Sequence, residues 1–325
     1  MSLDRSLLPQ EMGGVFLTDG GIETTLIFHE GWELPHFAAF DLLKSAEGTR
    51  ALYTYYARYA AMARANGLGF VLESPTWRAS RDWGEKLGYS PAALADANGK
   101  AMRLMGELRE AFASENSAMV ISGCVGPRGD GYDPGSVMGV EEASAYHAAQ
   151  IASFAAYGAD MVTAITMTNA PEAIGVVRAA EAIGLPVAIS FTVETDGRLP
   201  TGQGLPAAVA EVDGATGSAP RYYMINCAHP THFAGVLKTQ GAWVQRMRGL
   251  RANASRRSHA ELNEAPNLDA GDAGELAGQY RALLTRHPHM SVLGGCCGTD
   301  HRHLEAICAA CGLAPVAPRP PVATA

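Results

Sequence analysis

The 325-residue sequence lacks any apolar run long enough to cross a membrane. No stretch approaches the roughly 18 consecutive apolar residues that a spanning helix needs. Residues 1–14 carry charge and proline, and they contain no apolar core of the kind found in a signal peptide. These absences predict a cytoplasmic protein without a membrane partner.

The sequence also lacks an excess of positive charge, since its formal net charge is −8. Nucleic acids and anionic membranes select basic patches, and the only short basic cluster in the middle of the chain is Arg256 and Arg257. A nucleic-acid partner is therefore not expected. Hydrophobic residues make up 47% of the chain and charged residues 18%, which is typical of a globular protein with a sizeable core.

Cysteine is scarce, with six residues, which is too few for a disulfide scaffold in a chain of this length. A Gly-x-Gly-x-x-Gly motif after the first predicted strand is also missing, and this disfavours a dinucleotide-binding fold. The placement of the few cysteines consequently matters more than their number.

Eight short apolar runs alternate with longer helical segments along the chain. The runs are rich in Val, Ile, Phe and Met without strict alternation, as expected for strands that are covered on both faces. This order fits a single (β/α)8 TIM barrel of the α/β class better than an open doubly wound sheet. The predicted strands are Val15–Asp19, Gly69–Glu73, Ala118–Gly123, Asp160–Ile165, Pro186–Phe191, Tyr222–Asn226, Trp243–Leu250 and Met290–Leu293, and the clearest predicted helices are Glu47–Asn66, Glu141–Tyr157 and Pro171–Ile183.

One domain is expected over residues 1–325, with a core from about 15 to 311. The polar segment 254–274 is expected to cover the mouth or the side of the barrel. The tail from about residue 314 is rich in Pro and Ala and is predicted to be a loose end.

Residues that can carry chemistry follow several of the predicted strands, at the end of the barrel where catalysis takes place in this fold. The first strand leads into Asp19-Gly20-Gly21, and the sixth ends in Asn226-Cys227. The eighth runs into Gly294-Gly295-Cys296-Cys297-Gly298. The sequence therefore predicts the active site at this rim.

Cys227, Cys296 and Cys297 are the predicted ligands of one zinc ion. The glycines beside the adjacent cysteines permit the sharp bend that lets both bind one metal. Three thiolates leave one position open, which is typical of a catalytic zinc site, and a substrate thiol bound there would be deprotonated near neutral pH. The alternatives are a buried vicinal pair, and His229 or His232 as another zinc ligand.

The other cysteines are expected to pack in the core. Cys308 and Cys311 lie in a helical stretch, and Cys124 follows the third predicted strand, where contact with the site is the less favoured alternative.

Leu17-Thr18-Asp19-Gly20-Gly21, Ser190-Phe191-Thr192, Asn226-Cys227 and Gly294-Gly295-Cys296-Cys297-Gly298-Thr299 resemble the homocysteine S-methyltransferase family, and the resemblance runs from about Val15 to Cys311. It implies a zinc-dependent methyltransferase that converts homocysteine to methionine. Zinc would be held by the three cysteines, and the amino-acid part of homocysteine by Asp19, Gly20 and Gly21. Asn226 and Thr166 belong to the same expected substrate site, whereas the Tyr146-His147-x-x-Gln150 pattern is expected to serve helix packing.

The sequence departs from the family pattern after the fourth strand, where the family usually has Phe-Glu-Thr and the Glu binds the substrate's amino group. Ile165 stands at the Glu position. Loss of a charge-assisted hydrogen bond would cost roughly 1.5–3 kcal/mol of binding. Either another acid compensates, with Glu73 and Glu194 as candidates, or the acceptor is a thiol other than homocysteine.

A methylated onium is the expected donor, because aromatic faces bind such cations. Trp77, Phe37 and Trp32 are the candidate aromatic residues for its site. A folate–cobalamin donor is not expected, because no further module follows the barrel. Two other functions stay open: a demethylase or thiol transferase with the same zinc chemistry, and a non-catalytic barrel that zinc stabilises and that binds a regulatory ligand.

Overall fold

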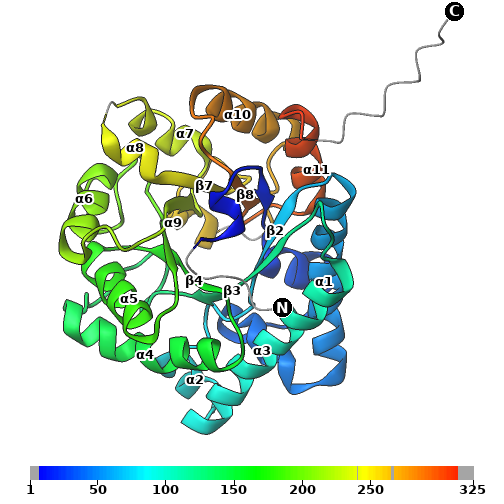
Figure 1. Ribbon diagram of the computed structural model, residues 1–325, viewed down its shortest axis with the longest axis vertical. Coiled ribbons are helices and arrows are strands. Elements are labelled where there is room, and N and C mark those ends of the chain that lie inside the picture. Colours follow the sequence, from blue (N-terminus) through cyan, green and yellow to red (C-terminus); the bar gives the residue numbers. More distant parts are fainter. Residues whose placement is uncertain (1–6, 240, 265–266, 314–325) are drawn as a thin grey trace, which may run out of the picture.

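Eight parallel strands form a closed barrel in chain order (Figure 1). The computed structural model describes residues 7–239, 241–264 and 267–313. Pairing of β8 with β1 closes the ring, which confirms the predicted (β/α)8 barrel. The strands are β1 (Phe16–Leu17), β2 (Gly69–Glu73), β3 (Met119–Val125), β4 (Met161–Met167), β5 (Val187–Phe191), β6 (Tyr223–Asn226), β7 (Met247–Ala252) and β8 (Val292–Gly295).

Helices surround the barrel, and the local sequence explains where they begin and end (Figure 1). The Ser45 hydroxyl accepts a hydrogen bond from the Gly48 N–H at the start of α1, and Gly184 ends α5 with a φ of 77°. The helices are α1 (Ala46–Ala65), α2 (Arg81–Lys86), α3 (Pro91–Phe112), α4 (Val140–Ala156), α5 (Ala170–Ile183), α6 (Leu205–Thr216), α7 (Pro230–Phe233), α8 (Ala242–Arg246), α9 (His259–Asn263), α10 (Ala273–Arg286) and α11 (His301–Ala310), with short helical turns η1 (Pro9–Glu11), η2 (Thr24–His29), η3 (Pro35–Phe37), η4 (Ala39–Lys44) and η5 (Val236–Lys238).

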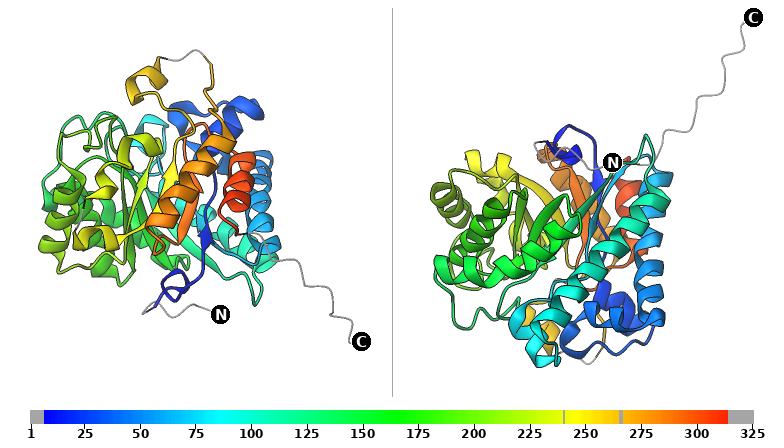
Figure 2. Two further views of the ribbon diagram at one scale, coloured as in Figure 1. Left: turned by 90° about the horizontal axis from the view of Figure 1, so that it is seen from above. Right: turned by 60° about the horizontal axis from the view of Figure 1, so that its bottom comes forward.

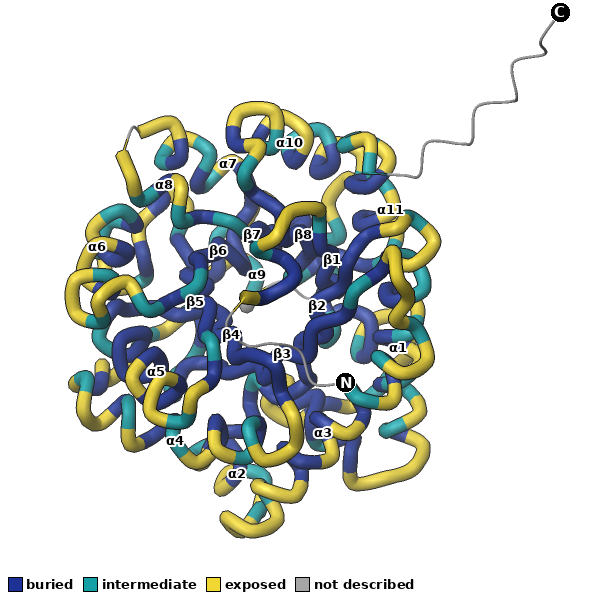
Figure 3. Tube along the Cα trace, in the orientation of Figure 1, coloured by how far each residue is buried: buried dark blue, intermediate teal, exposed yellow. Residues whose placement is uncertain are grey.

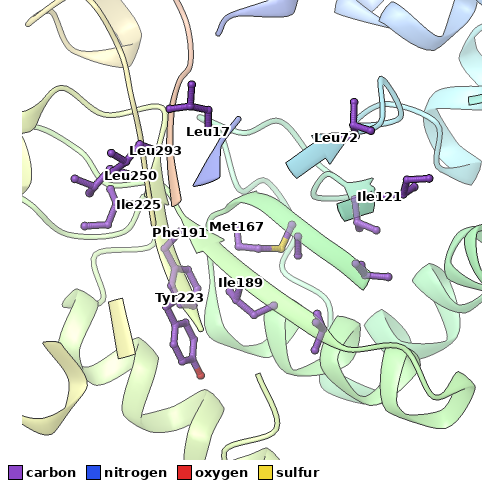
Figure 4. Packing of buried hydrophobic residues seen from close by; sticks show 14 of the residues in the cluster. Leu17, Leu72, Ile121, Met167, Ile189, Phe191, Tyr223, Ile225, Leu250 and Leu293 are labelled. Carbon is purple, nitrogen blue, oxygen red and sulfur yellow. The ribbon is translucent and has the colours of Figure 1, made fainter. Parts of the chain in front are cut away.

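The main hydrophobic core lies between the strands and the helices (Figure 3). Figure 4 shows part of it, from Leu17 on β1 to Leu293 on β8. A second, smaller apolar cluster includes Val71, Met161 and Met224 on the strands, and Leu8 joins it from the N-terminal segment. Leu8 and the neighbouring turn η1 therefore close the end of the barrel opposite the predicted site (Figure 2).

Polar side chains replace apolar ones two residues further along the same strands. Glu73 follows Val71 on β2 and Asn226 follows Met224 on β6, and both side chains are buried. Because strand residues two apart point to the same side, these groups form a polar layer inside the barrel, between the apolar plug and the rim. This layer is the floor of the predicted site.

Most predicted strand boundaries lie within two residues of the observed ones, and the largest error is at the start of the seventh strand. The strand predicted from Trp243 begins instead at Met247, because Ala242–Arg246 forms a one-turn helix that buries Val244. The eighth strand extends to Gly295, two residues beyond its predicted end. A Cβ atom at Gly294 would lie 1.8 Å from the Thr18 hydroxyl oxygen, so close packing against β1 explains why glycines occupy this strand.

In the part of the chain that the structure describes, no helix combines the length and the apolar character needed to span a bilayer. The predicted loose tail from residue 314 lies outside the described residues.

Candidate active site

Three cysteine sulfurs meet at the carboxyl ends of β6 and β8. Their Sγ atoms lie within 4.8 Å of one another, and those of Cys227 and Cys297 are 3.9 Å apart. Cys227 and Cys296 are joined as a disulfide, whereas Cys297 is a free thiol. The structure thus brings together the three residues predicted as zinc ligands, two of them in oxidised form.

The arrangement fits zinc once the disulfide is reduced. Zinc–sulfur bonds of about 2.3 Å in a tetrahedron place two sulfurs roughly 3.8 Å apart, close to the separation of Cys227 and Cys297. Three protein ligands leave the fourth position open, as in catalytic rather than structural zinc sites. Cys227 and Cys296 can act as ligands only as thiols, so metal binding by all three residues requires reduction of their bond.

The Asp-Gly-Gly turn after β1 contacts the cysteine turn directly. A Cβ atom at Gly21 would lie 2.6 Å from the Cys296 carbonyl oxygen, and one at Gly20 would lie 2.7 Å from the Tyr59 hydroxyl. The Gly21 N–H donates to the Thr299 carbonyl at 3.0 Å. Glycine at these positions therefore lets the two turns share one edge of the site.

Asp19 is buried and already has two strong partners. One carboxylate oxygen accepts from Arg251 at 2.7 Å, and the other accepts from the Tyr55 hydroxyl at 2.9 Å. Burial raises the pKa of Asp19, and the Arg251 guanidinium opposes this effect. Asp19 is therefore already paired with Arg251 at the site, and the sequence did not suggest this ion pair.

Asn226 supports the rim from within. Its amide oxygen accepts from the Thr166 N–H at 2.9 Å and from the Ser190 hydroxyl at 2.6 Å, while its NH2 group donates to the Thr166 hydroxyl at 2.8 Å. Thr166 and Cys227 have φ values of 62° and 52°, which are unfavourable for residues other than glycine. Asn226 thus holds the strained end of β4 beside the cysteines.

The two acids proposed to replace the family's Glu lie in different places. Glu73 is buried in the polar layer, where burial raises its pKa to about 7 and one carboxylate oxygen has no hydrogen-bond partner. Glu194 lies at the rim, with a carboxylate oxygen 3.0 Å from a ring nitrogen of His259. Ile165 is buried at the end of β4, and its carbonyl accepts from the Trp77 indole N–H at 3.3 Å.

His259 and Tyr132 form a stacked pair above the cysteines. Their ring centroids are 3.9 Å apart, the other His259 nitrogen donates to the Cys227 carbonyl at 2.6 Å, and the Tyr132 hydroxyl lies 3.1 Å from the Cys297 sulfur. The predicted cover by residues 254–274 thus includes a direct contact to a cysteine backbone. Sequence reasoning missed both rings, because Tyr132 lies in the loop after β3 and His259 begins the short helix α9, and no local pattern predicts that these two segments meet.

The aromatic residues predicted for donor binding are spread along the rim. Trp77 is half-buried beside the end of β4, and the Arg78 guanidinium lies 4.0 Å from the centre of its ring. Phe37 is 55% exposed, and Trp32 packs against the main core. Of the three candidates, Trp77 is therefore the one that contacts Ile165.

The alternative ligands and remaining motif residues have other partners. His229 contacts the Thr231 hydroxyl at 2.8 Å, and His232 contacts the Arg256 carbonyl at 2.9 Å. Burial lowers the pKa of His229 to about 4. His147 and Gln150 are buried: His147 lies beside Glu172, and Gln150 donates to the Thr76 carbonyl.

The cysteines outside the cluster lie where core packing was expected. Cys308 is buried on α11, Cys124 is buried on β3, and Cys311 is half-buried.

Solved structures with a similar fold include those of a homocysteine methyltransferase. Crystal structures of the homocysteine methyltransferase MmuM from Escherichia coli match with TM-scores of 0.74 for the oxidised form and 0.71 for the metallated form, each at 20% sequence identity. The matches cover 94% and 91% of this chain and 99% and 96% of MmuM. No curated protein matches the sequence.

The family model for homocysteine S-methyltransferase matches residues 16–311, nearly the whole barrel. This span includes the glycine turn after β1 and all three clustered cysteines. The chain belongs to the homocysteine S-methyltransferase family.

Proposed function

We propose that this protein is a zinc-dependent S-methyltransferase that moves a methyl group from an onium donor to the thiol of homocysteine, giving methionine in the cytoplasm. The observation that carries the proposal is the meeting of Cys227, Cys296 and Cys297 beside the Asp19-Gly20-Gly21 turn. Family membership supports a methyltransferase with a small thiol as acceptor.

A zinc ion held by the three cysteines would supply an open position where the acceptor thiol loses its proton and becomes a nucleophile. The protein's own groups set the geometry. Asn226 and His259 hold the chain on either side of Cys227, and the glycine turn lets the acceptor approach the cysteines. Trp77, whose ring already lies against the Arg78 guanidinium, is the aromatic residue proposed to contact the donor cation, so that its methyl group can be aligned for in-line displacement.

A second candidate function is the same chemistry with another thiol acceptor, or in the direction of demethylation. Ile165 favours it, because an alkyl side chain cannot bind an ammonium group. The Asp19–Arg251 ion pair favours it too, since it already uses an acid expected to bind the substrate.

Calorimetric titration of the reduced, zinc-loaded protein with L-homocysteine tests the acceptor without requiring the donor to be known. We expect binding that releases about one proton, measured in two buffers of different ionisation enthalpy, and no binding to the zinc-free protein. Methyl transfer is then assayed with S-methylmethionine, S-adenosylmethionine and betaine. Absence of homocysteine binding with zinc present and the fold intact would rule out this acceptor.

Cys227→Ala separates an enzyme from a barrel that only uses zinc for stability. If the protein is an enzyme, we expect the variant to lose methyl transfer. If the protein is a non-catalytic barrel that zinc stabilises, the natural chain has no methyl-transfer activity, and the variant is only less stable.

A further inference from the structure

Glu23 brings a further carboxylate close enough to Cys297, Asp19 and Arg251 to act on them electrostatically. It is half-buried and lies two residues after the Gly21 that packs on Cys296. The next residue, Thr24, accepts from the Gly298 N–H at 2.9 Å, which fixes this segment against the cysteine turn. The Glu23 carboxylate acts electrostatically on both the Cys297 thiol and Arg251.

The Glu23 carboxylate is not engaged by another side chain. In the described part of the chain it has no side-chain hydrogen bond and no ion pair, and only its own backbone N–H attracts it locally. The two cations that act on it are both taken, because Arg251 pairs with Asp19 and Arg78 pairs with Asp130 at 2.8 Å. Burial accordingly raises the pKa of Glu23 to about 7, as expected for an acid without a counter-ion.

A primary ammonium group is the ligand that would complete this arrangement. Its three N–H donors require oxygen acceptors, and a carboxylate gives the strongest of these hydrogen bonds. The methylated sulfonium or quaternary ammonium centre of a donor carries no N–H group and suits an aromatic face instead. In homocysteine the amino group stands three carbons from the sulfur, so a sulfur bound at the cysteines keeps the amino group close to them, and the residues on both sides of Glu23 contact the cysteine turn.

We propose that Glu23 binds the ammonium group of the acceptor thiol and thereby makes an amino-thiol the preferred acceptor. This inference rests on the proposed thiol-methyltransferase function. It assigns to a residue after β1 the recognition that Ile165 on β4 cannot provide, and it leaves Asp19 as the partner of Arg251.

The test compares two thiols that differ only in the amino group, homocysteine and 4-mercaptobutanoate. Calorimetry with the reduced, zinc-loaded protein gives both dissociation constants for the natural chain, Glu23→Gln, Glu23→Asp and the control Glu30→Gln, which changes an exposed acid seven residues away. The natural chain and the control are expected to prefer homocysteine by about 10- to 100-fold, the equivalent of one charge-assisted hydrogen bond.

Glu23→Gln is expected to bind both thiols within about threefold of each other, with unchanged zinc content and thermal midpoint. Glu23→Asp, which keeps the charge, should still prefer homocysteine. An undiminished preference in Glu23→Gln, or equal binding of the two thiols by the natural chain, would overturn the inference and leave the thiol chemistry intact. If the natural chain bound neither thiol, the proposed function would fail and the inference with it.

Discussion

The open end of the barrel consists of two halves that are built in different ways. The sulfur half comprises Cys227, which directly follows β6, and the adjacent Cys296 and Cys297, which follow β8 and are flanked by glycines. The charged half comprises Asp19, Glu23, Glu73 and Arg251, which come from the ends of β1, β2 and β7 and from the loop after β1.

The sulfur half follows the family pattern, whereas beside the charged half, which keeps the Asp19 of that pattern, Ile165 replaces the family's Glu. A metal site made of one bent turn and one distant residue tolerates little change, because each sulfur must lie at a fixed distance from the ion. A set of charges needs only to balance, and the same balance can be reached with acids on different strands. The thiol chemistry that the family shares can therefore be combined, in one site, with a different set of residues that recognise the substrate.

The strongest test of the sulfur half is Cys297→Ala. Removal of one of three ligands should lower zinc affinity by more than the roughly 10- to 100-fold that loss of a supporting residue costs. Zinc content after competition with a chelator measures this, and Cys311→Ser on the turn after α11 is the matched control that should retain the metal. Equal zinc retention in both variants would show that the three cysteines do not form one site.

The charged half is tested by Arg251→Met. Asp19 would stay buried without its ion-pair partner, and breaking a buried pair in this way costs about 3–5 kcal/mol of unfolding free energy. Urea denaturation measures the loss. The double variant Asp19→Asn with Arg251→Met removes both charges and should recover most of it, so equal losses in the single and double variants would contradict the assigned ion pair.

A smaller effect, confined to a pH window, is expected for Glu73→Gln. The folded chain raises the pKa of Glu73 from its ordinary 4.5 to about 7, so the folded state keeps a proton that the unfolded chain releases. The natural chain therefore loses stability as the pH rises from about 4.5 to 7, whereas the glutamine variant has no group that titrates at this position.

Urea denaturation at pH 5 and pH 8 measures the difference. The stability gained by Glu73→Gln should grow between these values by up to about 3 kcal/mol, because a pKa difference of one between the folded and unfolded states corresponds to about 1.4 kcal/mol. Glu110→Gln, at an exposed position on α3, should show no such growth. A gain that is equal at both pH values would mean that Glu73 titrates normally in the folded protein.

The sequence predicted the barrel, because buried parallel strands and helical repeats are local patterns. The boundaries of one strand were predicted to the residue, and those of most others within two residues. It also predicted the cysteine cluster, since the ligands follow strands at the same rim. The prediction that the seventh strand begins at Trp243 was wrong, because the strand-like residues 242–246 form a helical turn. Burial of a short connection overrode local preference there.

In the charged half, Asp19 and Glu73 were predicted as site residues, but the pairing of Asp19 with Arg251 was not, because it joins residues far apart in the chain. Arg251 and Asp19 are separated by 232 positions, and nothing local signals that they meet. The one local signal was Arg251 itself, because an arginine inside an apolar strand needs a buried acidic partner. Tyr132 and His259 gave no comparable signal, because loop residues stack only after both loops have been placed.

The stacked pair of Tyr132 and His259 links two loops and two of the cysteines. Tyr132 contacts the side chain of Cys297, and His259 contacts the backbone of Cys227. Any movement that admits a bulky donor between these loops must pull on both cysteines at once. The size of donor that can enter and the shape of the metal site are therefore mechanically coupled, and an attempt to widen the entrance for a larger donor would have to rebuild the support of the metal as well.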